Sequence, residues 1–284
     1  ILLDASGNRT EAEYLNQQYM AYSELIHSSN WTQIKQDYLS ETHHPGFWDS
    51  DRRFSILGEI EYMDRIESAL GTAGRLTDRL IGSSSASRNS FSLKLVRQLA
   101  QQLYLVSEAY QSFEKQLPKD VFLKVEAQFG VQKLVTEATD FFEQIVRMYH
   151  LWAQKRRMRW LVLQDIQKPG SKGQLLLAAI SGLGSYSILE AENGLHILET
   201  PKTQKSYHKH NIHVRICPQP EKPAQDQEAL TAQAIQQFSE KSEGSAKVVR
   251  HYRMEPSPLV RDNIRKWRSG RIDRVLEGDF DLMG

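Results

Sequence analysis

The hydrophobic pattern of this chain changes its period at Pro118, and this change limits the folds that the chain can adopt. Before Pro118 the apolar residues recur with a helical period, as along Leu95–Val106. After it they alternate with other residues, as along Val121–Val125, which is typical of a strand. A purely helical fold and a purely β fold are therefore excluded, and we expect a helical part followed by a part that contains a sheet.

Residues 1–117 are predicted to form an N-terminal helical domain, either a bundle or a long helical hairpin. The expected helices lie over residues 10–39, from Phe47 onward and over 91–117, and a short linker or turn is expected at 82–90.

Residues 118–284 are predicted to form an α+β domain with a mostly antiparallel sheet. The expected strands lie at 121–125, 160–163, 175–180 and 247–254, with two more around a polar loop within 194–217. The expected helices lie over 132–155, 185–191 and 227–241. The order of these elements from residue 120 to residue 217, which is strand, helix, strand, strand, turn, strand and strand, is the basis of this prediction.

The segment Gly194–Cys217 is the clearest candidate for a binding surface. In its second strand Ile212, Val214 and Ile216 alternate with basic or titratable residues, so one face is apolar and the other is not. Residues 200–220 carry four Lys or Arg residues, three histidines and no acidic residue. Such a hairpin suits a polyanion such as RNA, although an ordinary solvated hairpin with surface lysines accounts for the composition equally well.

A second concentration of positive charge lies in Lys247–Arg274, which holds nine Lys or Arg residues against three acidic ones. The net charge of the whole chain is only +1, so nucleic-acid binding would have to come from such local clusters. The basic run Lys155–Arg157 better suits the C-terminal end of a helix, where cations are favoured by the helix dipole. The candidate RNA-binding residues are Lys205, His208, Lys209, His213, Arg215, Arg250 and Arg253.

No motif for nucleotide binding or nucleophilic catalysis is present: neither a phosphate-binding glycine loop nor a Gly-x-Ser-x-Gly elbow occurs. His196 lies near two glutamates and could form an acid–base pair, but a histidine buried in a sheet core is the favoured interpretation. The side chains of His43 and His44 diverge, which disfavours a metal site. We therefore predict no cofactor, no metal and no small-molecule substrate.

The single cysteine, Cys217, excludes an intrachain disulfide and fits a reducing compartment. No run approaches the roughly 18 apolar residues that span a bilayer, so no membrane partner is predicted. The expected location is the cytoplasm, with an organellar matrix or stroma as the alternative.

Several segments resemble the class 1 peptide chain release factors of bacteria and organelles, and most of them are closest to the type that recognises UGA and UAA. The matching segments are Pro45–Asp49, Arg147–Ala153, Ile180–Gly182, Leu189–His196, Leu259–Asp262 and Val275–Asp281. The resemblance implies a PCRF-domain protein of translation that binds the ribosome. Residues 118–284 would correspond to the family's decoding domain and would contact small-subunit rRNA and mRNA.

The chain departs from this family where the catalytic loop would be. Release factors carry a Gly-Gly-Gln loop whose backbone amide stabilises the oxyanion of ester hydrolysis. This sequence has sixteen glycines and no two are adjacent, so the hydrolytic domain is expected to be missing near residues 218–226. We therefore expect a protein that is not an enzyme. The alternatives are an mRNA-binding and stabilising paralogue, a conventional release factor with a truncated sequence, and a decayed paralogue with protein partners only.

The resemblance also names codon-recognition candidates, which are Thr200, Pro201, Lys202, Thr203 and His210. Pro201–Thr203 fits the family's Pro-x-Thr tripeptide, and His210 has the spacing of the histidine that stacks on a stop-codon base. Two neighbouring motifs depart from the family, because Ile197 replaces an arginine and Asn211-Ile212 replaces Thr-Ser. We expect stop-codon recognition to be altered or lost.

Overall fold

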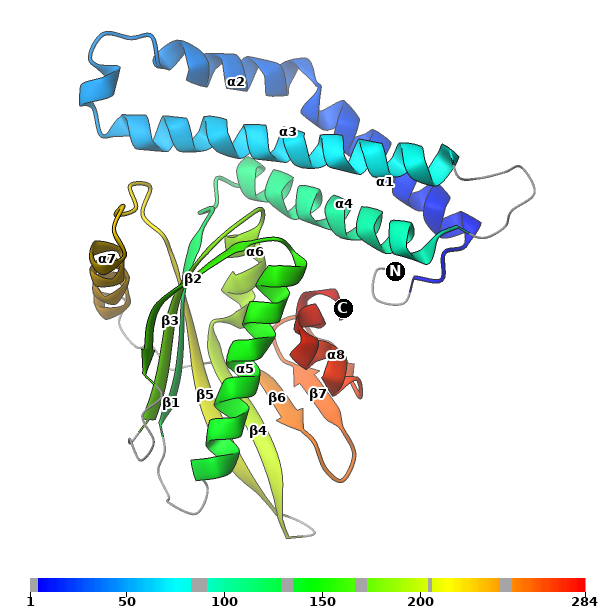
Figure 1. Ribbon diagram of the computed structural model, residues 1–284, viewed down its shortest axis with the longest axis vertical. Helices are drawn as coiled ribbons and strands as arrows, with labels where there is room; N and C mark the ends of the chain where they lie inside the picture. The colour runs from blue at the N-terminus through cyan, green and yellow to red at the C-terminus, as the bar shows by residue number, and fades with distance from the viewer. Residues whose placement is uncertain are drawn as a thin grey trace. The chain divides into compact units, whose positions relative to one another are not determined.

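The computed structural model of the protein describes residues 5–82, 91–128, 135–166, 173–203, 206–240 and 247–283. The chain divides into two compact units (Figure 1). One unit comprises residues 1–117 with 220–222, and the other comprises 118–219 with 223–284.

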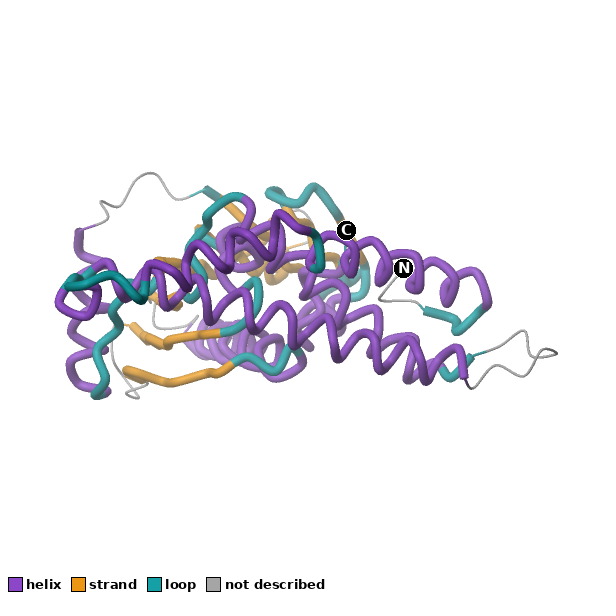
Figure 2. The backbone as a smooth tube through the Cα atoms, turned by 90° about the horizontal axis from the view of Figure 1, so that it is seen from above, coloured by secondary structure: helices purple, strands orange, loops and turns teal. Residues whose placement is uncertain are grey.

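The described part of residues 1–117 consists of helices and loops (Figure 2). The elements are α1 (Arg9–Ile26), α2 (Ser29–Glu41), the 3-10 turn η1 (Phe47–Asp49), α3 (Arg52–Gly82) and α4 (Leu93–Glu114). One core cluster joins α1, α3 and α4 through Leu15, Leu80, Val96 and Leu99. Most of the linker expected at 82–90 lies outside the described residues.

The prediction of one helix over residues 10–39 is wrong, because the chain breaks between α1 and α2. The Ser28 hydroxyl accepts a hydrogen bond from the backbone N–H of Trp31 at 3.2 Å, and His27 ends the preceding helix. A serine that caps a helix start in this way satisfies a donor that the helix itself leaves free. The helix expected from Phe47 likewise begins later, at Arg52, after the single turn η1.

The second unit contains an eight-stranded sheet in the order β2-β3-β1-β5-β4-β6-β7-β8. The strands are β1 (Val121–Gln128), β2 (Arg159–Ile166), β3 (Gly173–Ser181), β4 (Gly194–Thr203), β5 (Ser206–Pro218), β6 (Val248–Arg253), β7 (Leu259–Asp262) and β8 (Arg268–Ser269). All neighbouring strands run antiparallel except β4 and β6, which are parallel. The predicted α+β class with a mostly antiparallel sheet is confirmed.

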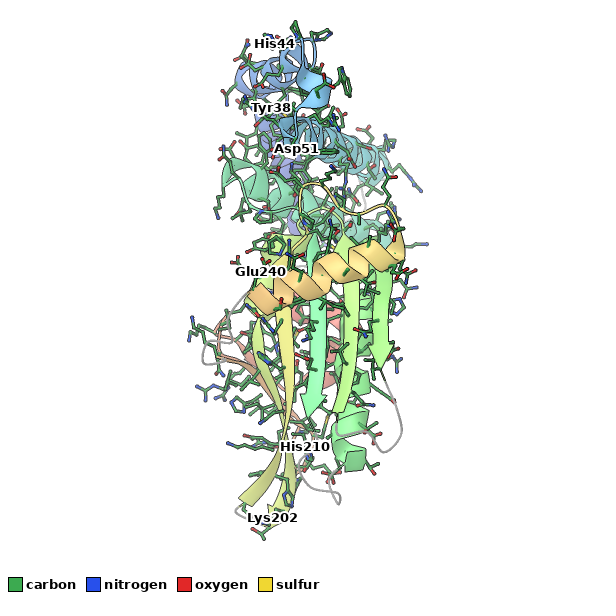
Figure 3. The ribbon with its side chains drawn as sticks, turned by 90° about the vertical axis from the view of Figure 1, so that its left-hand side faces the viewer. Tyr38, His44, Asp51, Lys202, His210 and Glu240 are labelled. Carbon is green, nitrogen blue, oxygen red and sulfur yellow. The ribbon has the colours of Figure 1, made fainter. Side chains whose placement is uncertain are left out.

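Two longer helices cover opposite faces of this sheet (Figures 1 and 3). Helix α5 (Val135–Lys155) packs its apolar side on one face, and α7 (Gln227–Glu240) crosses the other. The shorter helical elements of this unit are α6 (Ser185–Leu189), η3 (Glu190–Glu192), α8 (Ile272–Arg274), η4 (Val275–Asp279) and η5 (Phe280–Leu282). The sequence pattern did not predict β7 and β8, which are short and carry few apolar residues.

The alternation predicted for the second hairpin strand is confirmed. Ile212, Val214 and Ile216 are buried, whereas His213 and Arg215 on the other face are half-buried. In the described part of the chain, no helix combines the length and apolarity that crossing a membrane requires.

Candidate nucleic-acid interface

The hairpin of β4 and β5 places most of the predicted codon-recognition residues at one end of the sheet. The strands pair in one register from Gly194 opposite Val214 to Pro201 opposite Tyr207, and the register shifts before Thr203, which lies opposite Ser206. Figure 3 shows Lys202 at the end of the hairpin that lies away from α7. Pro201, Lys202 and Thr203 are all exposed there. The predicted RNA-binding residue Lys205 lies outside the described residues.

A carboxylate from α5 joins two of the predicted residues at the base of this tip. The Thr200 hydroxyl donates to Glu137 Oε2 at 3.0 Å, and His210 Nε2 lies 2.9 Å from the same oxygen. His210 Nε2 also lies 3.0 Å from Thr200 Oγ1, so the three side chains form one cluster. Glu137 was not among the predicted site residues, because nothing in its sequence neighbourhood shows that it faces the hairpin.

The burial of His210 contradicts a stacking role in the conformation described. Its residue surface is only 4% exposed, and its ring is held by Thr200 and Glu137. Stacking on a nucleobase requires an open ring face, so His210 is not available for it here.

The remaining basic or titratable residues of the hairpin differ in how exposed they are. Lys209 is exposed, and His208 and His213 are half-buried. Arg215 is also half-buried and donates from Nη2 to the Phe238 carbonyl of α7 at 2.7 Å, with its guanidinium 5.3 Å from the Phe238 ring centre. An RNA contact by Arg215 would therefore compete with its bond to α7, whereas Lys202 and Lys209 reach solvent directly.

The predicted RNA contact by Arg250 is wrong, because its guanidinium is fully buried. Arg250 Nη2 donates to Glu192 Oε1 at 2.9 Å and to Asp262 Oδ2 at 2.7 Å. A fully buried guanidinium cannot reach a ligand at the surface, and its removal would leave two buried carboxylates without their shared partner. Arg253, on the same strand, is half-buried and donates to the Ser257 carbonyl at 3.3 Å, so its RNA contact stays a prediction.

The buried position predicted for His196 is confirmed. Its ring makes polar contacts with Tyr149, Tyr252 and the Glu192 carbonyl at 3.3, 3.1 and 3.2 Å. Burial lowers the pKa of His196 to about 4, which outweighs the opposite effect of the Glu192 carboxylate. The ring is therefore neutral near pH 7. Since it is 0% exposed, no substrate can reach this histidine for acid–base catalysis.

Burial also acts to raise the pKa of Glu192, but Arg250 and Arg265 oppose it and hold the pKa at about 2. Glu192 accepts hydrogen bonds from both guanidinium groups and from the Tyr149 hydroxyl. This carboxylate is thus the centre of a buried polar network. Glu192 lies in the segment Leu189–His196, which resembles a release-factor motif, but nothing in the sequence indicated that Arg250 and Arg265 would contact its carboxylate.

No group of three or more metal-binding side chains occurs in the described ranges, and Cys217 is buried.

The PCRF domain model matches residues 42–211, which is more than half of the chain and includes the tip of the hairpin. A curated relative, Peptide chain release factor 1 of Syntrophus aciditrophicus (strain SB), is 31% identical over 105 residues. That alignment covers 36% of this chain and only 28% of the relative. The solved structure of RF2 of Thermus thermophilus is similar with a TM-score of 0.46 and 15% identity, over 95% of this chain and 93% of that one. By the family match, this chain belongs to the PCRF domain family and is a class 1 release-factor-like protein.

Proposed function

We propose that this protein binds the decoding region of the ribosome through its β4–β5 hairpin and does not hydrolyse peptidyl-tRNA. The observation that carries the proposal is the exposed tip Pro201–Thr203, with Lys202 and Lys209 open to solvent, in a member of the PCRF domain family. Exposed cations on a protruding hairpin favour contact with rRNA and mRNA phosphates, whose charge dominates the affinity of nucleic-acid complexes. Such a protein would work in the cytoplasm or in an organellar matrix or stroma.

The absence of hydrolysis is proposed from the connection that follows β5. This strand ends at Pro218 and α7 begins at Gln227, so only a short segment joins them. The sequence contains no adjacent glycines that could present a Gly-Gly-Gln backbone amide to an oxyanion. A bound protein of this kind would occupy the decoding region without releasing the peptide, as a competitor of release factors or as a rescue or stalling factor.

Altered codon recognition is part of the proposal, and the cluster around Glu137 supports it. Thr200 and His210 are engaged with this carboxylate, which lies 50% exposed beside them. A carboxylate at this position repels RNA phosphates and competes with base contacts by the same two side chains. We expect binding to depend weakly, or not at all, on the codon.

Sedimentation with ribosomes that carry a stop or a sense codon tests the proposal, scored for binding and for peptide release. The protein should pellet with ribosomes and release no peptide, whereas release would contradict the non-hydrolytic assignment. The double variant K202E/K209E should bind more weakly, with a flatter salt dependence. The charge-matched control K94E/R97E changes two exposed residues of α4. Equal ribosome binding by K202E/K209E and K94E/R97E would show that the hairpin does not contact the ribosome. Binding to free mRNA, without binding to ribosomes, would favour a transcript-binding role.

A further inference from the structure

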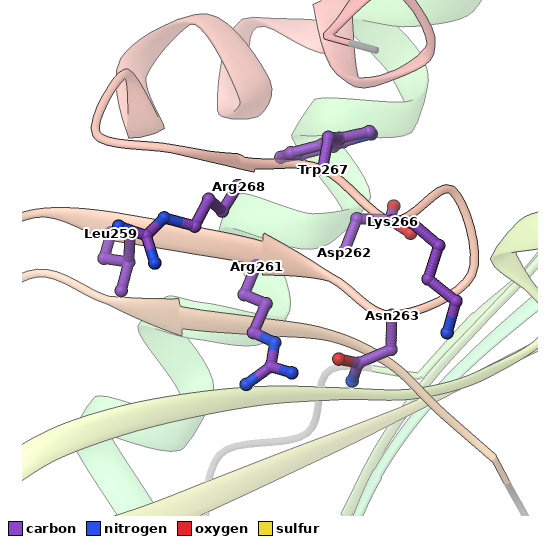
Figure 4. Close-up of a pocket in the computed structure, with 7 residues that line it drawn as sticks. All are labelled: Leu259, Arg261, Asp262, Asn263, Lys266, Trp267 and Arg268. Carbon is purple, nitrogen blue, oxygen red and sulfur yellow. The ribbon is translucent and has the colours of Figure 1, made fainter.

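The strands β7 and β8 and the turn between them border a pocket of about 430 Å³ that is separate from the hairpin tip. Its lining includes Arg261, Lys266 and Arg268, which are all exposed, together with Asn263 and Trp267. Figure 4 shows Arg261, Asn263 and Lys266 directed to the same side of the strand pair. Three fixed positive charges therefore surround one pocket.

These cations lack counter-charges among the residues that the structure describes. No described carboxylate forms an ion pair with Arg261, Lys266 or Arg268. The one acidic lining residue, Asp262, is turned inward: its Oδ2 accepts from Arg250 at 2.7 Å, and its Oδ1 accepts from the backbone of Arg265. The pocket consequently has a strong positive charge that nothing described in the chain neutralises.

The placement of two of the arginines is unfavourable for the protein by itself. Arg261 and Arg268 lie directly opposite each other in the register of β7 and β8. Like charges at directly opposed positions of an antiparallel pair destabilise it. Lys266 adds backbone strain, because its φ of 61° lies in the left-handed region that favours glycine. Unfavourable charge and unfavourable backbone at one pocket are typical of a ligand site.

The walls of the pocket are anchored to the rest of the sheet. Trp267 is 8% exposed, and the Arg250 guanidinium lies 5.3 Å from its ring centre. Asn263 donates from Nδ2 to the Val248 carbonyl at 3.2 Å. The cations thus extend from a fixed base, which lowers the entropy lost when a ligand binds.

We infer that this pocket binds phosphate groups of an RNA backbone, as a second contact distinct from the hairpin. Arginine forks match phosphate oxygens in a bidentate way. The basic positions also continue across the strands, because His251 of β6 lies opposite Arg261, which lies opposite Arg268. His251 itself lies close to a carboxylate, with its Nδ1 3.3 Å from Glu199 Oε1. The facing arginines Arg261 and Arg268, with Lys266 at the adjoining turn, suit successive phosphates of a polymer better than one small anion. The inference does not depend on ribosome binding.

Fluorescence anisotropy with a labelled oligouridylate, at salt concentrations from about 50 to 200 mM, tests it. The double variant R261Q/R268Q should weaken binding about tenfold and reduce the slope of log K against log salt by about 1.4, since each lost phosphate contact contributes about 0.7 on single strands. The control R159Q makes the same chemical change at one exposed arginine of β2, at the opposite edge of the sheet, and should leave both quantities unchanged. Unchanged affinity and slope in R261Q/R268Q would overturn the inference.

Two further measurements are needed. The first distinguishes an RNA ligand from a small phosphate ligand, and the second shows whether R261Q/R268Q is still folded when it binds RNA more weakly. Inorganic phosphate, added at constant ionic strength, should not displace the oligonucleotide; displacement would assign the pocket to a small phosphate ligand and overturn the RNA assignment. The thermal midpoint of R261Q/R268Q should equal or exceed that of the unmodified protein, because the variant relieves the opposed charges. An unfolded variant would contradict that argument, and the single variant R268Q then repeats the binding test. R261Q/R268Q and K202E/K209E are compared in both binding assays. Loss of oligonucleotide binding in R261Q/R268Q with its ribosome binding intact supports the pocket alone, and loss of ribosome binding in K202E/K209E with its oligonucleotide binding intact supports the hairpin alone.

Discussion

Arg250 and Glu192 form a fully buried ion pair, with Nη2 and Oε1 2.9 Å apart, although 58 residues separate them in the sequence. Asp262 accepts from the same guanidinium, so the pair connects β6 to β7 and to the turn η3. Removing charged groups from water is costly, and the cost is offset only where each charge keeps its partners. The interior of the sheet unit therefore depends on this network being complete.

Replacing Arg250 by methionine should lower the free energy of unfolding by about 3–5 kcal/mol, because two buried carboxylates lose a shared partner. Urea unfolding, followed by circular dichroism, measures the change. The control R159M makes the same chemical change at an exposed position of β2 and should alter stability by no more than about 0.5 kcal/mol. Similar losses of unfolding free energy in the two variants would show that burial and pairing of Arg250 add nothing to stability beyond what an exposed arginine contributes.

Stability should fall as the pH drops below neutrality, and His196 should cause part of the fall. Burial lowers the folded-state pKa of His196 to about 4, whereas an unfolded histidine titrates near 6.5. Between these values the unfolded chain binds a proton that the folded chain does not, so acid favours unfolding. Glu192, with a folded pKa of about 2, contributes in the same direction but at lower pH, below about 4.5.

The measurement is urea unfolding at pH 7 and pH 5 for the unmodified protein and for H196Q. The unmodified protein should lose about 2 kcal/mol more than the variant over this interval, given the two pKa values. The comparison of two differences cancels the contribution of other titrating groups and any cost of the substitution itself. Equal losses would show that His196 does not titrate across its unfolding transition.

The local hydrophobic pattern of the sequence predicted much of this fold. The features that it did not predict depend on contacts between residues far apart in the sequence. The alternation along Ile212–Ile216 places that strand correctly, because which face is buried follows from the period of the backbone. Arg250 was assigned to the surface, since a basic residue among other basic residues carries no local sign of burial. Its partners Glu192 and Asp262 become neighbours only when β6 lies between β4 and β7.

The hairpin site shows the same division. Lys202 and Lys209 could be predicted as exposed cations from the absence of acidic residues around them. The cluster of Thr200, His210 and Glu137 could not, because Glu137 reaches the hairpin only through the packing of α5 on the sheet. Charge density along the sequence therefore indicates a binding surface, and tertiary structure decides which of its side chains are free.

Replacing Glu137 by glutamine should strengthen RNA binding about two- to fivefold, because the hairpin loses a negative charge that repels phosphate; this is the scale expected of a half-exposed ionic interaction. Anisotropy with an oligonucleotide measures the affinity. The control E143Q removes an exposed carboxylate from the same helix, α5, and should change affinity less. Weaker binding in E137Q would mean instead that Glu137 orders Thr200 and His210 for contact with RNA.

Gly194, where β4 begins, should be the least replaceable glycine of the sheet. Its φ is +148°, and a Cβ atom there would lie 2.2 Å from the Lys247 carbonyl oxygen, a backbone atom that cannot move aside cheaply. Leu195 donates to that same carbonyl at 2.8 Å, next to the parallel pairing of β4 with β6. Gly194→Ala should therefore cost at least about 3 kcal/mol, from strain together with the clash.

The matched control is Gly270→Ala in the same unit, where a Cβ atom would lie 3.4 Å from the Pro258 carbonyl oxygen and φ is outside the left-handed region. This change should cost less than about 1 kcal/mol. Urea unfolding gives both values, and amide exchange along β4 and β6 should accelerate in Gly194→Ala alone, because the clash lies at their junction. Equal stability of the two variants would mean that β6 can shift away from β4, and that the parallel pairing does not hold the hairpin in place.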